Sequence, residues 1–187
     1  EAVGLKVKVV VTDGTQPVGV GIGPALEAMD VLSVLKDEPK APKDLRERSL
    51  AIAGELFELS GKSKSGAGYK AVATLLSSGY AYNKFIEICK AQGGFTEPQK
   101  AKYNEVITSQ VAGTVVDIDN RRLAKLAKLA GAPTAQKAGM KFHVPIGTKV
   151  KKGQPLFTLY AEAQGELKYA LTYLKSENGK DIVRITG

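Results

Sequence analysis

Residues 11–30 read VTDGTQPVGVGIGPALEAMD, and this stretch sets the expected fold of the first half of the chain. Just before it, residues 4–12 read GLKVKVVVT, and the apolar run from Val9 is typical of a strand buried on both faces of a parallel sheet. Glycines at 14, 19, 21 and 23 follow, and Pro24 suits the first turn of a helix that we expect to reach about Leu35. The predicted order is therefore strand, glycine-rich turn and helix.

The glycine-rich turn has the composition of a phosphate-binding loop but not its spacing. A dinucleotide-binding fingerprint needs G-x-G-x-x-G and a later acidic residue, whereas these glycines follow G-x-G-x-G and Pro24 has no N–H to offer. The GKS at 61–63 also fails as a P-loop, because Leu56 stands where that motif needs glycine. We interpret residues 19–24 as a turn that lets backbones pack closely. Asp13, at the end of the strand, is either a turn residue or a carboxylate that faces a ligand.

The rest of the chain divides into a helical part and a mixed part. Three further helices are expected, at about Lys43 to Gly61 (with Ile52 and Leu56 on its inward face), 69–77 and 80–91. GGFTEPQKA, at 93–101, then looks like a boundary, and beyond it strands alternate with helices. One of these helices starts near Asp119 or Asn120 and turns Leu123, Leu126, Ala127 and Ala130 inward. The expected fold class is α/β and α+β, with domains at 1–94 and 95–187.

Composition excludes several classes of protein. The chain has 187 residues, 43% of them hydrophobic, and no run approaches the ~20 apolar residues of a membrane span. The single cysteine, Cys89, excludes an internal disulfide and suits a reducing compartment, so we expect a cytoplasmic protein. The net charge of +8 raises nucleic acid as a partner, but the lysines are dispersed and are not interleaved with aromatic residues. We expect neither a nucleic-acid nor a membrane partner.

A second motif lies near the C-terminus. PIGTKVKKGQPLFTLYAE, at 145–162, contains G-x-x-V-x-x-G-x-x-L, which resembles the hammerhead fold of biotinyl and lipoyl carriers, and AGTVVDI at 112–118 resembles its other half. In carriers the modified lysine follows the GQPL half, and here the segment LYAEAQGE has none. The only histidine, His143, alternates with apolar neighbours in a short strand and is expected to face solvent rather than to act as a base.

Together, these segments resemble one family, the nucleoside phosphorylases of the thymidine phosphorylase class. TDGTQPVGVGIGPALEAMDVL, at 12–32, is similar to that family's T/S-D-x-x-Q-P-x-G-x-x-I-G-x-A-L-E segment. Residues 110–133 and 147–171 are similar to its C-terminal α/β hammerhead domain. The resemblance covers most of the chain and implies a pentosyltransferase fold: the tail of the phosphorylase α/β domain, then the hammerhead domain.

Within the family, GIGPALEA, AGAP and LYAE resemble the archaeal-type AMP phosphorylases. That resemblance implies cleavage of AMP by phosphate to adenine and ribose 1,5-bisphosphate. The alternatives are a thymidine or pyrimidine nucleoside phosphorylase and a non-catalytic hammerhead module. The family's phosphate-binding, base-binding and catalytic residues precede the segment at which this chain begins, and the first residue is Glu1. We therefore expect a C-terminal fragment that is inactive by itself.

The resemblance also implies a few site residues. Thr12, Asp13 and Gly14 would lie at the rim of the base and sugar cleft. Family members bind a monovalent cation through loop carbonyls and a carboxylate, and the matching positions here are Val18, Gly21 and Asp30, with oxygen ligands that suit a hard cation. Phosphate would be the co-substrate of a homo-oligomeric parent enzyme that needs no organic cofactor.

Overall fold

The computed structural model describes residues 4–187, apart from the side chain of Asn178. Its chain divides into two compact units, the first made of residues 1–13 and 30–96 and the second of residues 14–29 and 97–187. Residues 1–3 of the predicted N-terminal domain lie outside the described part. The sequence interpretation placed residues 14–29 with the first domain. In the structure this segment belongs to the second unit, because it supplies a strand to that unit's sheet.

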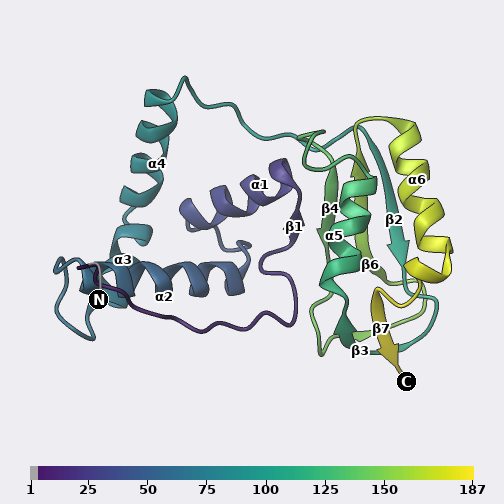
Figure 1. Cartoon of the computed structure of the whole chain (residues 1–187), viewed down its shortest axis with the longest axis horizontal. Helices are drawn as coiled ribbons and strands as arrows, with labels where there is room; N and C mark the ends of the chain where they lie inside the picture. Colours follow the sequence, from purple (N-terminus) through teal and green to yellow (C-terminus); the bar gives the residue numbers. More distant parts are fainter. Residues whose placement is uncertain (1–3) are drawn as a thin grey trace. The chain divides into compact units, whose positions relative to one another are not determined.

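The first unit is helical in its described residues. Its elements are the end of α1 (Pro24–Leu35), α2 (Lys43–Leu59), α3 (Gly68–Ser77) and α4 (Tyr80–Ala91), shown in Figure 1. These bounds confirm the predicted helices within one or two residues. A small apolar core holds them together, formed by Val34, Ala41, Leu50, Val72 and Leu76. The inward face of α2 was predicted partly wrongly, because Ile52 and Leu56 are 41% and 57% exposed.

The predicted parallel strand at residues 4–12 is wrong for this structure. These residues form no strand, and Val9 and Val11 are 79% and 92% exposed. All the strand pairs that the structure describes between residues 4 and 187 are antiparallel. The physical reason is that a strand exists only as part of a sheet, and no described strand pairs with this segment.

The second unit contains two antiparallel sheets and two helices (Figure 1). One sheet has the order β1-β4-β6-β2, with β1 at Gly21–Ile22, β4 at Gly139–Phe142, β6 at Pro155–Ala161 and β2 at Tyr103–Thr108. The other has the order β5-β3-β7, with β5 at Lys149–Val150, β3 at Gly113–Ile118 and β7 at Val183–Thr186. Helices α5 (Asn120–Leu129) and α6 (Gln164–Lys175) and the short turn η1 (Glu177–Gly179) complete it. The expected mixed α/β fold is confirmed.

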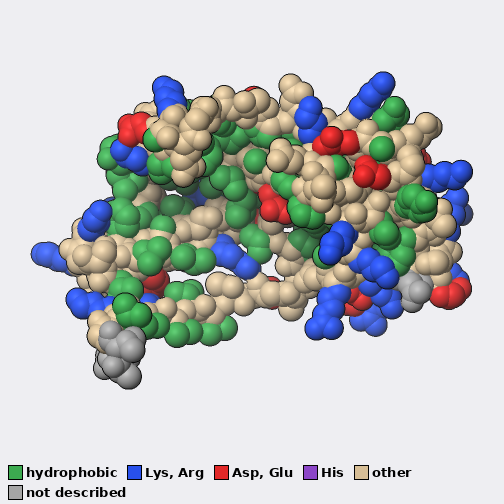
Figure 2. All heavy atoms as spheres, turned by 45° about the horizontal axis from the view of Figure 1, so that its top comes forward, with side chains coloured by type: hydrophobic (Ala, Val, Ile, Leu, Met, Phe, Trp, Pro, Cys, Tyr) green, Lys and Arg blue, Asp and Glu red, His purple; other side chains and the backbone are tan. Residues whose placement is uncertain are grey.

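One core serves both sheets of the second unit. Leu123, Leu126 and Ala127 from α5 are at most 4% exposed, as the helical spacing predicted. They pack in the same cluster as Met140 and Phe157 from the four-stranded sheet. Among residues 4–187, no helix is both long enough and apolar enough to cross a membrane. Figure 2 shows Lys and Arg side chains gathered at the lower right, over the second unit.

The first turn of α5 depends on a side-chain cap. Asp119 Oδ1 accepts a hydrogen bond of 2.9 Å from the backbone N–H of Arg122, which has no partner within the helix. We expect Asp119→Ala to lower the free energy of unfolding of the second unit by about 1 kcal/mol. Chemical denaturation followed by circular dichroism measures this. Asp117→Ala, on the neighbouring strand, is the control and should change stability by less than about 0.5 kcal/mol.

The start of α3 depends on a carboxylate from α2. Glu58 Oε1 accepts a hydrogen bond of 2.8 Å from the backbone N–H of Gly68, and this bond, with one from Gly66, lowers the pKa of Glu58 below its ordinary value of 4.5. A depressed pKa means that the ionised carboxylate stabilises the fold above about pH 4.5 and that this contribution is lost as the pH falls through the folded-state pKa.

We therefore expect Glu58→Gln to lower the melting temperature of the first unit at pH 7 and to lower it less at pH 3. Thermal unfolding at both pH values checks this, with Glu87→Gln on the exposed surface of α4 as the control. An equal decrease of the melting temperature at pH 7 and pH 3 would contradict a stabilising role for the charge of Glu58.

Candidate functional site

The segment from Gly14 to Met29 is fixed to the second unit by hydrogen bonds at several points. Gly14 O accepts a bond of 3.1 Å from Asn120 Nδ2, and Gln16 Oε1 accepts one of 2.8 Å from the backbone N–H of Ile146. The backbone N–H of Phe142 donates to Val20 O at 2.6 Å. The glycine-rich turn is thus part of the same folded body as the C-terminal sheet and α5.

Close backbone packing accounts for the glycines of the turn. A β-carbon on Gly21 would lie 2.4 Å from the carbonyl carbon of Leu26. Gly23 has φ +116°, and a β-carbon there would lie 2.4 Å from Ala138 O. Side chains at either position would displace β1 from its neighbours. This geometry agrees with the packing interpretation of residues 19–24.

The N-terminus of α1 is already partnered by protein groups. The backbone N–H of Gly23 donates to Glu27 Oε1 at 2.9 Å, and that of Ala25 donates to Gln136 O at 3.0 Å. Pro24, between them, has no N–H. These N–H groups are the ones that a phosphate would need at a helix N-terminus. The turn therefore lacks the donors of a phosphate cradle at these three positions.

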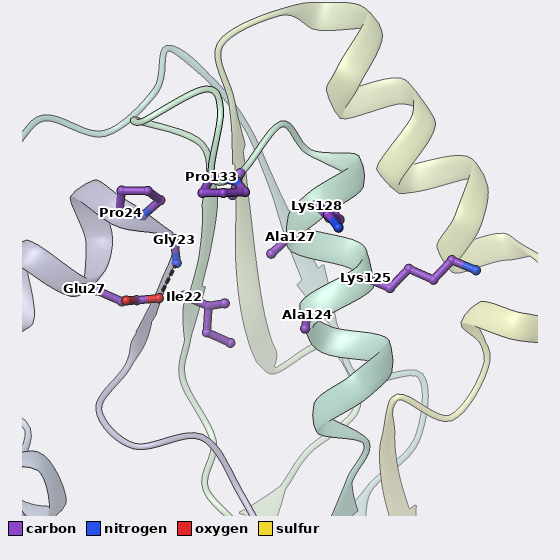
Figure 3. Close-up of a pocket in the computed structure, with 10 residues that line it drawn as sticks. Ile22, Gly23, Pro24, Glu27, Ala124, Lys125, Ala127, Lys128 and Pro133 are labelled. Atoms are coloured by element: carbon purple, nitrogen blue, oxygen red, sulfur yellow. Dashed lines mark hydrogen bonds between the residues drawn. The ribbon is translucent and has the colours of Figure 1, made fainter.

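A cavity of about 720 Å³ opens beside this turn, within the second unit. Its walls come from β1 and the start of α1, from one face of α5 and from the turn after α5, and Figure 3 shows Ile22, Ala127 and Pro133 around it. The Ala132–Pro133 peptide bond is cis. The lining is mainly apolar, includes no His, Cys or Ser side chain, and carries one carboxylate, Glu27, and two amines, Lys125 and Lys128.

Two of the charged residues at the cavity, Glu27 and Lys125, have other partners or point aside. Figure 3 shows the Glu27 carboxylate turned back to Gly23 and the Lys125 side chain directed away from the cavity. Lys125 Nζ lies 5.0 Å from the centroid of the Tyr173 ring, a cation–π contact. Lys128 is the other cation of the lining. The cavity was not predicted from the sequence, because two segments distant in the chain, 22–27 and 124–133, form it.

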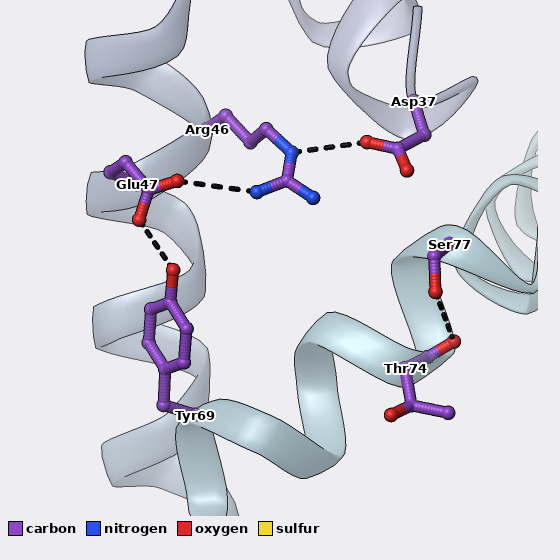
Figure 4. A network of polar contacts seen from close by, with 6 residues as sticks. All are labelled: Asp37, Arg46, Glu47, Tyr69, Thr74 and Ser77. Carbon is purple, nitrogen blue, oxygen red and sulfur yellow. Dashed lines mark hydrogen bonds and ion pairs between the residues drawn. The ribbon is translucent and has the colours of Figure 1, made fainter.

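The first unit contains a polar network of its own, shown in Figure 4. Arg46 on α2 lies 3.0 Å from an oxygen of Asp37 and 3.2 Å from one of Glu47. The Tyr69 hydroxyl donates to Glu47, and this hydrogen bond raises the pKa of Tyr69 above its ordinary value of 10.0. The contacts connect the end of α1 with α2 and α3. A tyrosine that stays protonated in this way ties helices together and does not serve as a base near neutral pH.

The predicted substrate-proximal residues are exposed and lie in irregular backbone. Thr12, Asp13 and Gly14 are all exposed, and the strand expected to present them is absent. Asp13 O accepts a hydrogen bond from Arg48 Nη2 on α2. Thr12 and Asp13 belong to the first unit, and Gly14 belongs to the second. Their proximity to a substrate stays a prediction.

The predicted cation ligands also belong to both units. Val18 is half-buried and Gly21 is buried, both in the second unit, whereas Asp30 is 8% exposed and belongs to the first. Within the described residues, no group of three or more His, Cys, Asp or Glu side chains could hold a metal ion. A site built from carbonyl oxygens and one carboxylate is a different arrangement, and it stays a prediction.

His143 lies just after β4 and is exposed, as its alternation predicted. Its Nε2 is 2.9 Å from Thr158 Oγ1. Partial burial, together with Lys141 and Lys100, lowers the pKa of His143 below 6.5, so the ring is neutral at pH 7. This partner of His143 is a threonine hydroxyl, which does not form an acid–base pair with it.

Comparison with known proteins finds one family similar to part of this chain. Residues 114–179 match the family model described as the pyrimidine nucleoside phosphorylase C-terminal domain. This part of the chain is similar to the C-terminal domain of pyrimidine nucleoside phosphorylases. The matched residues run from β3 through η1 and include α5, α6 and the cavity's α5 wall.

Curated relatives extend the similarity to the first unit. A protein of Hahella chejuensis named "Putative thymidine phosphorylase" is 52% identical over 172 residues, which cover 92% of this chain and 34% of the relative. A relative in Acidovorax sp. is 54% identical over 90% of this chain, and one in Ralstonia nicotianae is 52% identical over 91%. The chain spans about a third of the length of these phosphorylase relatives.

Proposed function

We propose that this chain is part of a phosphorylase that cleaves pyrimidine nucleosides with inorganic phosphate, giving the free base and a pentose 1-phosphate. The observation that carries the proposal is the match of residues 114–179 to the pyrimidine nucleoside phosphorylase C-terminal domain. Identity of about half over most of the chain, to relatives named as thymidine phosphorylases, supports it.

The nucleoside is favoured over AMP as the substrate of the parent enzyme. The resemblance of GIGPALEA, AGAP and LYAE to the AMP phosphorylases suggested the nucleotide. The names of the relatives favour thymidine, and those relatives are bacterial rather than archaeal. AMP therefore remains as the competing substrate in the test below.

In this proposal the chain supplies a wall of the substrate cleft rather than the catalytic groups. Thr12, Asp13 and Gly14 border the base and sugar, and Val18, Gly21 and Asp30 hold a monovalent cation in the assembled homo-oligomer. Phosphate is the co-substrate. The cavity beside α5 has no His, Cys or Ser side chain in its lining, its carboxylate Glu27 accepts a bond from Gly23 N–H, and the N–H of Ala25 is also used, which supports placing the chemistry elsewhere.

The isolated chain is expected to show no phosphorolysis. Incubation with phosphate and either thymidine, uridine or AMP, followed by chromatography of the bases, measures this. The unaltered Hahella relative is the positive control. Release of a base by the 187-residue chain alone would contradict a role as cleft wall.

A chimera tests the function itself. In the Hahella relative, the 172 matched residues are replaced by the corresponding residues of this chain. We expect thymidine phosphorolysis within about tenfold of the unaltered relative, a change of under ~1.4 kcal/mol in the barrier. Adenine release from AMP, without thymine release from thymidine, would select the AMP branch instead. A folded chimera that is inactive on every substrate would overturn the proposal.

A further inference from the structure

The four-stranded sheet of the second unit has two chemically different faces. Met140 of β4 and Leu159 of β6 are on one face and pack in the same apolar cluster as residues of α5 and α6. Successive residues of a strand point to opposite faces, so Lys141, Thr158 and Tyr160 are on the other face. We call the surface formed by these three residues the polar face of the sheet.

The strand register brings several polar groups together on the polar face. Lys141 lies directly opposite Thr158 in the pairing of β4 with β6. Residues opposite each other in this way have β-carbons about 5 Å apart. His143, two residues after Lys141, places its Nε2 at 2.9 Å from Thr158 Oγ1. Because Thr158 is only 7% exposed, its hydroxyl is a fixed point that holds the imidazole ring beside the lysine.

A second lysine reaches the polar face from the segment just before β2. Lys100 Nζ lies 5.5 Å from the centroid of the Tyr160 ring, a cation–π contact. The residue that follows it is fixed by a hydrogen bond of 3.1 Å from Ala101 N–H to Lys137 O. Within residues 4–187, neither Lys100 nor Lys141 forms an ion pair with a carboxylate. Both amines are therefore available to an anion from solution.

The electrostatics of His143 show that both lysines act on the same point. Burial is the main cause that lowers the pKa of His143, and the charges of Lys141 and Lys100 lower it further. A neutral ring that accepts from the Thr158 hydroxyl at Nε2 carries its proton on Nδ1 and can donate it. Lys100 and His143 are exposed and Lys141 is half-buried, so a solute can reach all three.

We propose that Lys100, Lys141 and His143 bind the dianionic phosphoryl group of inorganic phosphate or of a phosphate monoester. The two amines supply charge-assisted hydrogen bonds to phosphate oxygens, and the imidazole supplies a third donor. Two cations favour a dianion over a carboxylate, because a single negative charge would leave much of their mutual repulsion uncompensated. The inference concerns binding alone and does not depend on the proposed function.

The histidine reports directly on the proposed site. His143 is the only histidine of the chain, so one ring-proton resonance in the NMR spectrum of the untagged protein follows its protonation. The pKa of His143 is measured in phosphate and in chloride at equal ionic strength, so that screening of the lysines by salt is the same in both samples. We expect phosphate to raise this pKa toward its ordinary value of 6.5, because a bound anion favours the charged ring. Equal pKa values in the two samples would overturn the proposal.

Three ligands identify the source of the phosphoryl group. Inorganic phosphate, ribose 5-phosphate and ribose are each titrated at pH 7 while the His143 resonance is followed. A response to both phosphates identifies the phosphoryl group itself as the ligand, and a response to one of them identifies the free anion or the ester. Each of these results supports the proposal. A response to ribose as large as that to ribose 5-phosphate would contradict it.

Charge-removing substitutions test the two lysines. Lys141→Gln and Lys100→Gln should each weaken phosphate binding about tenfold, because each removes one charge-assisted hydrogen bond. Each should also raise the pKa of His143 in the absence of phosphate, since a repelling cation is lost. A purely structural role for either lysine would not produce that second effect.

Lys168→Gln is the matched control. Lys168 is exposed on α6, and this helix packs through Ala170 into the core on the opposite face of the sheet. The control should leave both the phosphate affinity and the pKa of His143 unchanged. Circular dichroism checks that each variant is folded, and Lys100→Gln, at an exposed position outside the strands, carries the test should Lys141→Gln unfold. Unchanged affinity in Lys100→Gln, or an equal loss in Lys168→Gln, would overturn the proposal.

Discussion

Gly139→Ala is expected to destabilise the second unit by roughly 3 kcal/mol. Gly139 begins β4, where the antiparallel register places Ile22 opposite Met140 and Gly21 opposite Lys141. A β-carbon on Gly139 would lie 2.0 Å from Ile22 O and 3.1 Å from the α-carbon of Gly23. Both are backbone atoms, so neither can rotate aside. The residue also has φ +142°, which strains any side chain.

The loss of stability in Gly139→Ala should be confined to the second unit, which contains the clash. Amide exchange reports each unit separately, so the amides of β6 should exchange faster in Gly139→Ala while those of α2 keep their rates. Gly165→Ala is the matched control, because a β-carbon there meets no atom within 4 Å, and it should leave stability unchanged or slightly raised. A Gly139→Ala protein as stable as its parent would show that β1 does not pack on β4 as described.

Gly68→Ala is expected to have a similar effect on the first unit, again roughly 3 kcal/mol. Helices α2 and α3 pack with their backbones in contact at this point. A β-carbon on Gly68 would lie 2.2 Å from Gly54 O, and one on Gly54 would lie 2.7 Å from the backbone nitrogen of Tyr69. Separating the helices would also weaken the hydrogen bond of 2.8 Å from Gly68 N–H to Glu58.

Thermal and chemical unfolding of Gly68→Ala measure this effect. Lys70→Ala, at an exposed position two residues further along α3, is the control and should change stability by less than about 0.5 kcal/mol. A midpoint for Gly68→Ala that equals that of the parent chain would mean that α2 and α3 do not require the glycine pair.

Local signals predicted the helices well. Pro24 marked the start of α1, Asp119 marked the cap of α5, and the spacing of Leu123 and Leu126 identified its buried face. Each of these depends on residues within one or two turns of the same helix, so the sequence pattern contains the needed information. The interpretation of the glycine-rich turn as a close-packing element agrees with the backbone contacts at Gly21 and Gly23.

The features that depend on pairing between distant segments could not be predicted from the sequence. The interpretation of residues 4–12 as a buried strand assumed neighbouring strands, and the described residues include none beside it. Residues 14–29 join the second unit through contacts between residues more than 100 positions apart in the sequence, such as Gln16 with Ile146. No local sequence pattern predicts such contacts. The cavity is a product of the same long-range contacts. The predicted site residues Thr12, Asp13 and Gly14 can be evaluated only with the substrate present.

Phosphate-dependent thymine release by the chimera tests the central claim most directly. Thymidine is supplied with and without phosphate, and thymine and deoxyribose 1-phosphate are both quantified. A phosphorylase built with this chain should form the two products in equal amounts and only when phosphate is present. Formation of thymine with free deoxyribose in the absence of phosphate, or no thymine from a folded chimera while the unaltered relative is active, would contradict the account.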